Sequence, residues 1–339
     1  MRPSFVKNAV KSLPLALSQT RFAREFAHKL PPTIYNDTVK AALEVDYASV
    51  KDRDAALMTV TQSINSWVHQ NTVAAFKQTS VGSEGIYNPA LLQIYDNFVW
   101  EYNSPYLWRI ESNEILDLYR ECVGNSHNHC EIAVGTGYFL DAMVKERQLK
   151  IDTADDGSDE NKITDTLTLM DLNPNTLEVC EQRLKVALAT TNNGDGNDIS
   201  LTKLHYDVVA GKVMDGGDTK AREHAYDSVA ANFLFHCLHD DNKELETTRS
   251  AISNIRRLVH PKDGVFFGST ILGKDILEED DNPSAKETLE KYNKWGIFGN
   301  QHDSFEGIAQ LLDDHFNTVD VWRSGYCAVW KAKHPKLSA

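Results

Sequence analysis

Residues 130–140 read Cys-Glu-Ile-Ala-Val-Gly-Thr-Gly-Tyr-Phe-Leu, an apolar run that leads into a glycine turn and then a helical pattern, and this stretch decides the fold. Glycine lets backbone approach a ligand without a clash from a Cβ atom. The helix predicted over Tyr138–Leu149 offers unpaired N–H groups in its first turn. A strand, a glycine turn and a helix N-terminus therefore favour a cofactor site, although glycine turns also occur where a chain simply reverses.

A second apolar run, Leu167–Leu172, carries an acid, Asp171, next to its last residue. In a doubly wound sheet, an acid at the end of the second strand can accept hydrogen bonds from both hydroxyls of a ribose. A role for Asp171 as a helix cap is less favoured, because Pro174 fits the first position of the next helix with Asn173 as its cap. Asp171 is therefore a candidate ribose ligand.

The whole second half of the chain alternates apolar runs with helical stretches, which predicts parallel strands in a sheet covered on both faces. Ser324-Gly325 separates the last two runs and predicts an antiparallel hairpin at the sheet edge. A further acid, Asp207, stands just past the third run. The predicted strands are Cys130–Val134, Leu167–Leu172, Ile199–His205, Tyr226–Asn232, Val265–Leu272, Thr318–Arg323 and Tyr326–Lys333.

Up to about residue 125 the pattern is helical instead, with helices predicted over Asp52–Phe76, Leu91–Tyr102 and Ile110–Val123. We expect three parts: a basic leader over residues 1–30, a helical cap with the substrate region over 31–125, and a cofactor-binding domain over 126–335.

The order of elements over residues 128–333 resembles the class I S-adenosylmethionine-dependent methyltransferases: a glycine loop, an acid after the second strand and another after the third, a Tyr-Asp strand, and Asp263-Gly264 before the fifth strand. The phrases Glu131–Leu140 and Ala231–Leu238 look like the family's small-molecule enzymes, including those of natural-product pathways. The resemblance implies an α/β fold, a Rossmann-like seven-stranded mostly parallel sheet with an antiparallel C-terminal hairpin, here preceded by the α-helical cap.

The resemblance also implies S-adenosylmethionine (SAM) as the cofactor and assigns roles by position. Glu131 is expected near the methionine amino group, Asp171 at the ribose diol and Asp207 at the adenine amine, while the end of the fourth strand lines the passage to the substrate. The expected cofactor-binding residues are Glu131, Ala133, Gly135, Gly137, Asp171, Leu172, Asp207, Val208, Asn232 and Phe233.

One position departs from the family pattern, because Ala133 stands where the loop usually has its first glycine. One added methyl group shifts the loop slightly and leaves the interpretation in place. A nicotinamide-binding Rossmann domain is the competing interpretation, but its G-x-G-x-x-G pattern fails, since the third position after Gly135 and Gly137 is Leu140.

Methyl transfer needs alignment of nucleophile, methyl group and sulfur, and a base when the acceptor is a hydroxyl. His236 is the candidate base and His239 a weaker one, because both follow the fourth strand at the edge where the site opens and histidine titrates near neutrality. His236 can instead be structural, and an amine or activated carbon acceptor needs no base.

Aromatic residues of the cap and of the segment Tyr292–Asp303 are candidates for substrate contact. In the cap, Tyr95 and Trp108 can face a flat or apolar substrate or shield the sulfonium. The segment can act as a lid, with Trp295, Phe298 and His302 closing on the substrate. Core packing is the alternative for all of these aromatic residues.

The charge of the 339-residue chain is unevenly distributed: the total is −14, yet residues 1–30 hold six basic residues and one acid. The acidic balance argues against a nucleic-acid partner, and no apolar run approaches the ~20 residues of a membrane span. The leader is typical of either a mitochondrial transit peptide or an amphipathic helix that packs on the body or a partner subunit. We therefore expect a cytoplasmic protein, or a mitochondrial one if the leader is a transit peptide, with homodimerisation through the N-terminal helices as an option.

The five cysteines include no C-x-x-C pair, and no Asp, Asn and His set beside the fourth strand favours a metal. We expect methyl transfer to a small secondary metabolite, more often at oxygen than at nitrogen or carbon. Two alternatives stay open: the same pocket used for cyclisation or isomerisation, and a SAM-fold regulatory protein without catalysis.

Overall fold

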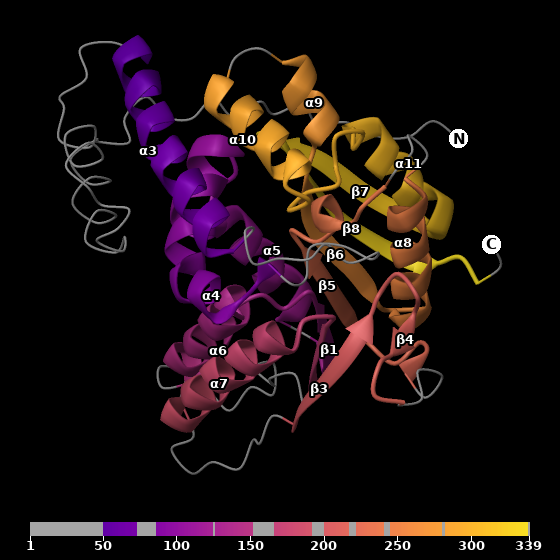
Figure 1. The fold of residues 1–339 in the computed structure, drawn as a ribbon. Coiled ribbons are helices and arrows are strands. Elements are labelled where there is room, and N and C mark those ends of the chain that lie inside the picture. Colours follow the sequence, from indigo (N-terminus) through magenta and orange to yellow (C-terminus); the bar gives the residue numbers. More distant parts are fainter. Residues whose placement is uncertain are drawn as a thin grey trace.

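The computed structural model describes residues 50–72, 86–124, 126–151, 166–191, 200–216, 222–240, 245–279 and 282–337. The basic leader and any dimer contact that it makes lie outside these residues. A group of N-terminal helices lies beside a sheet that is flanked by further helices (Figure 1). The N-terminal helices are α3 (Val50–Asn71), α4 (Pro89–Tyr95), the π-helix η3 (Asp96–Leu107) and α5 (Ser112–Val123).

The sheet has eight strands in the order β4-β3-β2-β1-β5-β6-β8-β7. Strands β3, β2, β1, β5 and β6 pair in parallel, whereas β8 pairs antiparallel with both β6 and β7. The strands are β1 (Asn128–Ile132), β2 (Thr166–Asp171), β3 (Ser200–Asp207), β4 (Lys212–Val213), β5 (Ser228–Asn232), β6 (Val265–Ile271), β7 (Phe316–Ser324) and β8 (Cys327–Pro335). The mostly parallel sheet with an antiparallel C-terminal hairpin is thus confirmed, and the two-residue strand β4, antiparallel to β3, is an addition.

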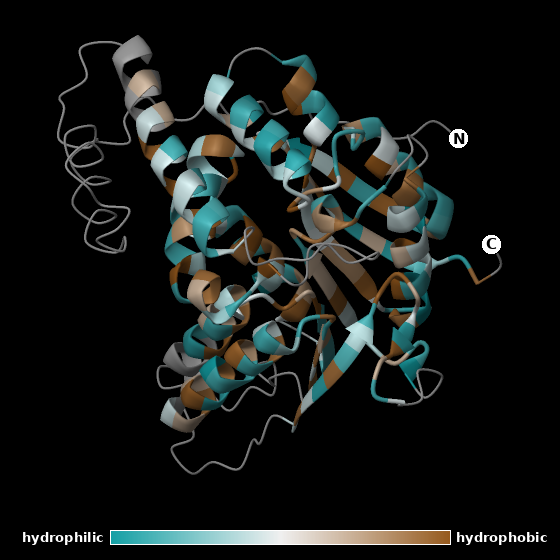
Figure 2. Ribbon diagram, viewed as in Figure 1, coloured by the Kyte–Doolittle hydropathy of each residue, from teal (hydrophilic) through white to brown (hydrophobic). Residues whose placement is uncertain are grey.

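Two apolar cores lie on the two faces of this sheet. Side chains alternate along a strand, so Phe267 packs in the core shared with α5, α6 and α7, while Phe266 packs in the core shared with α8 and α11. Hydrophobic colour marks the central strands β5 and β6, and the exposed turns of α10 are hydrophilic (Figure 2). The remaining helices are α6 (Tyr138–Ile151), α7 (Pro174–Thr191), the 3₁₀ turn η6 (Phe235–Cys237), α8 (Glu246–Leu258), α9 (Gly273–Glu278), α10 (Pro283–Lys294) and α11 (Phe305–His315).

Helix α7 begins as the sequence predicts. The Asn173 side chain accepts a hydrogen bond from the Asn175 N–H at 2.8 Å, and Pro174 occupies the first helical position. This cap holds the chain just after Asp171 in a fixed turn, and the Asn173 N–H also donates to the Asp171 carboxylate at 2.8 Å. The acid at the end of β2 is therefore held in place by the cap that follows it.

The predicted helix Leu91–Tyr102 takes a different form. Helix α4 ends at Tyr95, and the chain continues as a π-helix to Leu107, closed by a 2.9 Å hydrogen bond from the Trp108 N–H to the Asn103 carbonyl five residues earlier. Pro105 lies inside this turn. We call α3, α4 and η3 together the helical cap. Wide π turns are rare and are frequent at functional sites.

Candidate active site

A first cavity opens where β1, β2, β3 and β5 end, and its volume is about 1030 Å³ including the solvent at its mouth. This edge is where parallel sheets bind ligands, because the chain order reverses between β1 and β5. All ten positions expected to bind the cofactor line this cavity: Glu131, Ala133, Gly135, Gly137, Asp171, Leu172, Asp207, Val208, Asn232 and Phe233.

The glycine loop runs along one wall in the left-handed backbone region. Gly135 has φ +52° and Gly137 φ +71°, and a Cβ atom added to Gly137 would lie 2.7 Å from the Cys180 sulfur. Ala133 has φ +59°, which costs a residue with a Cβ atom about 1–2 kcal/mol. Alanine thus keeps the backbone path of a glycine loop, under local strain.

Three acids surround the same cavity at separate points. Asp207 Oδ1 accepts the N–H groups of Val209 and Ala210, both at 2.9 Å, which fixes its carboxylate after β3. Glu131 is buried at the end of β1. Burial raises the pKa of Asp171 to about 6, against hydrogen bonds from its neighbours that lower it. The cavity therefore offers three fixed acceptors for groups that donate hydrogen bonds.

Several residues that line this cavity were not singled out from the sequence, and three of them matter most here. Tyr119, on α5, lines the first cavity and donates a 2.6 Å hydrogen bond to Glu131 Oε1. Tyr87, just before α4, and Trp100, in η3, line it as well, and the Trp100 ring centroid lies 4.9 Å from that of Phe233. No local motif marks these residues, because they reach the site through packing between distant segments.

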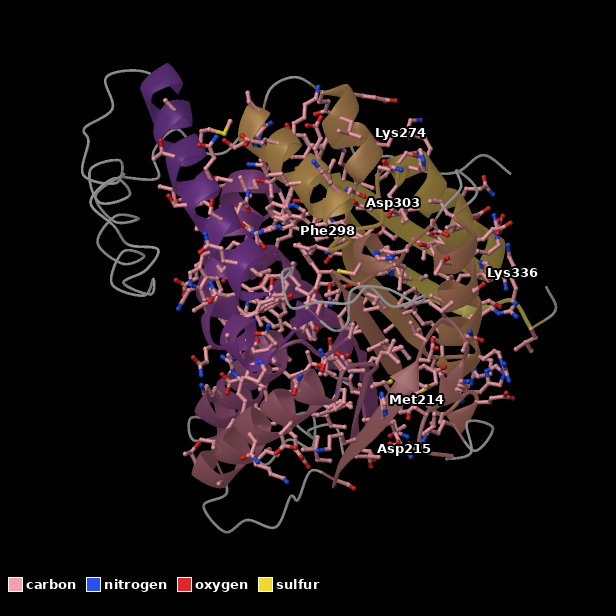
Figure 3. All side chains as sticks on the ribbon, in the orientation of Figure 1. Met214, Asp215, Lys274, Phe298, Asp303 and Lys336 are labelled. Atoms are coloured by element: carbon pink, nitrogen blue, oxygen red, sulfur yellow. The ribbon has the colours of Figure 1, made fainter. Side chains whose placement is uncertain are left out.

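A second cavity lies directly under the helical cap. It shares Tyr87, Tyr95 and Phe233 with the first cavity, so the two are adjacent. Its wall is mostly apolar or aromatic and is formed by Val68, Ile86, Tyr87, Leu91, Tyr95, Phe98, Val99, Asn103, Trp108, Phe233, His236, Ile271, Tyr292, Ile297 and Phe298. Among the candidates for substrate contact, Tyr95, Trp108 and Phe298 line this cavity, and Figure 3 shows Phe298 where the cap meets the sheet.

The two candidate bases lie in different places. The His236 ring faces the second cavity between Phe233 and Phe298, at ring-centroid distances of 5.6 and 4.5 Å. Burial lowers the pKa of His236 to about 3, so its imidazole is neutral at ordinary pH. The Nε2 atom of His239 instead lies 3.2 Å from the Gly296 carbonyl, and this residue lines neither of the two cavities.

The segment Tyr292–Asp303 is held on the body by hydrogen bonds to main-chain carbonyls, one from a main-chain N–H and one from the side-chain amide of Asn300. The Gly299 N–H donates to the His236 carbonyl at 3.0 Å, and the Asn300 amide donates to the Ile271 carbonyl at 2.9 Å. Trp295 packs on His69 of α3, and it and His302 line neither cavity. In this structure the segment forms a wall of the second cavity through Tyr292, Ile297 and Phe298.

The part of the chain that the structure describes was searched for a metal site and for a membrane-spanning helix. Within it, no group of three His, Cys, Asp or Glu residues is placed to hold a metal ion. None of its helices is both long and apolar enough to cross a membrane.

Several known proteins with similar sequences are named methyltransferases, although no family model matches the chain. Demethylluteothin O-methyltransferase of Streptomyces thioluteus is 28% identical over 255 residues, 75% of this chain and 92% of that protein. Methyltransferase aurB of Calcarisporium arbuscula is 26% identical over 259 residues, 76% and 99% of the two chains. The physcion biosynthesis cluster O-methyltransferase of Aspergillus chevalieri is 28% identical over 254 residues, 74% and 95%. This chain is a class I SAM-dependent methyltransferase.

One solved structure shares the fold. An O-methyltransferase family protein from Burkholderia thailandensis superposes with a TM-score of 0.51 at 13% identity, over 84% of this chain and 73% of that one. That likeness supports the Rossmann-like fold, while the sequence relatives carry the activity. Methyltransferase relatives imply the use of SAM by this enzyme.

The residues of the first cavity fit that cofactor. SAM carries an ammonium group, a ribose diol and an adenine amine, and the cavity presents three separate acids, Glu131, Asp171 and Asp207, as acceptors. The left-handed loop adds backbone that a ligand can approach closely at Gly135 and Gly137.

Proposed function

We propose that this methyltransferase transfers the methyl group of SAM to a hydroxyl group of a flat, largely apolar small molecule held in the second cavity. The observation that carries the proposal is the adjacency of the two cavities, which share Tyr87, Tyr95 and Phe233. An acceptor under the cap thereby lies next to the cofactor pocket. The names of the relatives, O-methyltransferases in two of the three cases, support oxygen as the acceptor atom.

The aromatic wall supports a flat substrate. Trp108 and Phe298 lie 6.0 Å apart between ring centroids, and Tyr292 packs edge-on to Phe298 at 5.1 Å. Such surfaces bind planar apolar molecules by burying area without demanding hydrogen bonds. Polar groups are few on this wall, so they would set the orientation of the acceptor rather than its affinity.

We propose His236 as the base that takes the hydroxyl proton. Thr270 Oγ1 lies 3.5 Å from Nδ1 and also accepts the His236 main-chain N–H at 3.0 Å, so Nε2 is the atom left to meet an acceptor. The bound cofactor supplies a methyl group on a positively charged sulfur. As that charge disappears with the methyl group, the neutral ring gains the proton, so the net charge within the buried site stays constant. This balance offsets the low pKa that burial gives to His236 when the site is empty of substrate.

The experiment is incubation of the enzyme with methyl-labelled SAM and a set of planar phenols, each paired with the matching aniline and with the O-methylated phenol. We expect label in the phenol products, none in the O-methylated controls, and little in the anilines. Label on the anilines alone would contradict oxygen as the acceptor atom. A product that forms without label would instead favour cyclisation or isomerisation in the same pocket.

A further inference from the structure

Tyr119 is the buried residue on which two of the cofactor-facing side chains converge. It lies on α5, the helix before β1, and its side chain is only 1% exposed. The ring stacks on Phe139 at 5.3 Å between centroids and meets Phe267 edge-on at 5.1 Å. The ring is thus fixed by apolar packing, and the hydroxyl reaches the crevice between β1 and β5.

The hydroxyl joins the ends of those two strands. It donates to Glu131 Oε1 at 2.6 Å, and it accepts from the Asn232 amide nitrogen at 3.1 Å. The other oxygen of the carboxylate, Oε2, lies 3.2 Å from His129 Nε2. The other end of the amide, Asn232 Oδ1, accepts from the Ser269 hydroxyl at 3.0 Å. Both groups are therefore held at two points, with Tyr119 common to the pair.

The direction of these hydrogen bonds is fixed as well. Burial, and then the charge of Glu131, raise the pKa of Tyr119, so the hydroxyl keeps its proton at any working pH and donates it to the carboxylate. The Asn232 amide must then present its NH₂ group to the tyrosine oxygen and its carbonyl to Ser269. A rotated amide would turn the Asn232 carbonyl oxygen toward the Tyr119 oxygen, whose proton is already donated to Glu131. Two buried acceptors would then face each other, which costs about 1–3 kcal/mol.

We propose that Tyr119 is a positioning residue for the amino-acid end of SAM, acting through Glu131 and Asn232. The hydroxyl holds the carboxylate and the amide in one orientation before the cofactor binds, so binding the ammonium group orders no side chain. The inference rests on SAM as the cofactor and is independent of which acceptor atom is methylated.

The test compares two ligands that differ in this end of the cofactor. S-adenosylhomocysteine carries the amino-acid end, whereas methylthioadenosine keeps the adenosine and lacks it. By calorimetry, Tyr119→Phe is expected to raise the Kd for S-adenosylhomocysteine about tenfold, since a hydrogen bond to a charged group is involved. The Kd for methylthioadenosine should stay within about twofold, because Phe keeps the ring packing. A general structural defect would weaken both ligands equally, and that result, or an unchanged Kd for S-adenosylhomocysteine, would overturn the proposal.

Tyr226→Phe is the matched control. It removes another buried hydroxyl, one that accepts from Arg222 at 3.1 Å and lies outside both cavities. Binding of both ligands should be unchanged in it. Failure of the wild-type protein to bind either ligand would refute the cofactor and this proposal together.

A double-variant cycle keeps the proposal testable if Tyr119→Phe alone folds poorly. In Tyr119→Phe the buried Glu131 carboxylate loses the hydroxyl that donates to its Oε1 atom. Glu131→Gln replaces that carboxylate with a neutral amide, so the double variant lacks the main source of instability. In the Glu131→Gln background, Tyr119→Phe should change the Kd for S-adenosylhomocysteine less than about threefold, because the two residues act as one unit. A full further tenfold loss would contradict action through Glu131.

Discussion

The two adjacent cavities of this enzyme are built in opposite ways. The first cavity, where we expect the cofactor and which we call the cofactor cavity, is lined by residues at the ends of consecutive parallel strands. Among them are Glu131 near the end of β1, Asp171 at the end of β2 and Asp207 at the end of β3. The second cavity, under the cap, is where we propose that the acceptor binds, and we call it the acceptor cavity. Residues from segments as distant as Val68 on α3 and Phe298 after α10 line it. One cavity follows from the topology of a sheet, and the other follows from how helices happen to pack.

The difference has a physical origin. Parallel strands bring their carboxyl ends to one edge, so any polar residue just past a strand reaches the same crevice whatever its side chain. Helices of a cap meet through individual side chains, and the same aromatic residue can serve as core or as binding surface. Replacing a single polar residue of the cofactor cavity should therefore change the affinity for the cofactor strongly. In the acceptor cavity, replacing His236 should have a strong effect on activity, and few other substitutions should.

The largest effect should come from His236, because it tests whether the acceptor cavity holds any chemistry of its own. His236→Asn should lower kcat with a phenolic acceptor about 1000-fold, the scale of losing a general base. The Kd for S-adenosylhomocysteine should be unchanged, since His236 lines only the acceptor cavity. A kcat within about threefold of wild type would show that His236 is structural and that the cavity only binds.

Asp171→Ala should give the next largest effect, on the opposite side of the comparison. The role proposed for Asp171 at the ribose diol implies the loss of two charge-assisted hydrogen bonds, so the Kd for S-adenosylhomocysteine should rise about 100-fold by calorimetry. Phe298→Ala is the matched control from the acceptor wall, and it should raise KM for the acceptor while leaving that Kd unchanged. Equal Kd values for Asp171→Ala and wild type would mean that the ribose binds elsewhere.

The sequence predicted one side of this comparison far better than the other. The mostly parallel sheet, the antiparallel hairpin and the cap of α7 at Asn173 are confirmed, because strand patterns and capping chemistry are local. All ten cofactor positions meet at one cavity, while their roles stay predictions. Tyr119 escaped notice because nothing near it in the sequence relates it to Glu131, twelve residues away.

On the acceptor side the outcome is mixed for the same reason. Tyr95, Trp108 and Phe298 line the second cavity, whereas Trp295 and His302 line neither cavity. An aromatic residue in a loop carries no signal that separates a ligand contact from a contact with another helix, as the packing of Trp295 on His69 illustrates. The π-helical turn of η3 was not predicted either, because the sequence pattern over Leu91–Tyr102 indicates only a helix.

The pH dependence should also separate the two cavities, with a smaller effect. A carboxylate must be ionised to accept both ribose hydroxyls, and burial raises the pKa of Asp171 to about 6. Cofactor affinity should thus be full above pH 7 and fall below about pH 6, by about tenfold for each further unit. His236, with its pKa lowered to about 3, stays neutral over this range and should leave kcat at saturating SAM flat. Calorimetry between pH 5 and 8 measures the affinity for the cofactor, and saturation kinetics over the same range measure kcat. A fall of kcat parallel to that of the affinity would assign the titration to a group in the acceptor cavity.

The smallest effect concerns the strain at Ala133, where the cofactor loop departs from the usual glycine. Because Ala133 has φ +59°, Ala133→Gly relieves a backbone strain of about 1–2 kcal/mol in the folded state. Glycine also makes the unfolded chain more flexible, which destabilises the folded state by about 0.4–1 kcal/mol. The net should be a gain of about 0.5–1 kcal/mol in the free energy of unfolding, seen as a small rise in Tm. Ala309→Gly, the same chemical change inside helix α11, is the matched control and should cost about 1 kcal/mol.

Opposite signs in this pair would locate stored strain in the loop that approaches the cofactor. Equal losses would mean that the Ala133 methyl group contributes packing that outweighs its backbone strain, in a loop where it lies beside buried Val134. Affinity for S-adenosylhomocysteine in Ala133→Gly should stay within about threefold, because the backbone path is already that of a glycine. The loop would then carry backbone strain and still follow the path of a glycine loop. A cavity formed by the ends of parallel strands can thus tolerate a residue that the local backbone geometry disfavours.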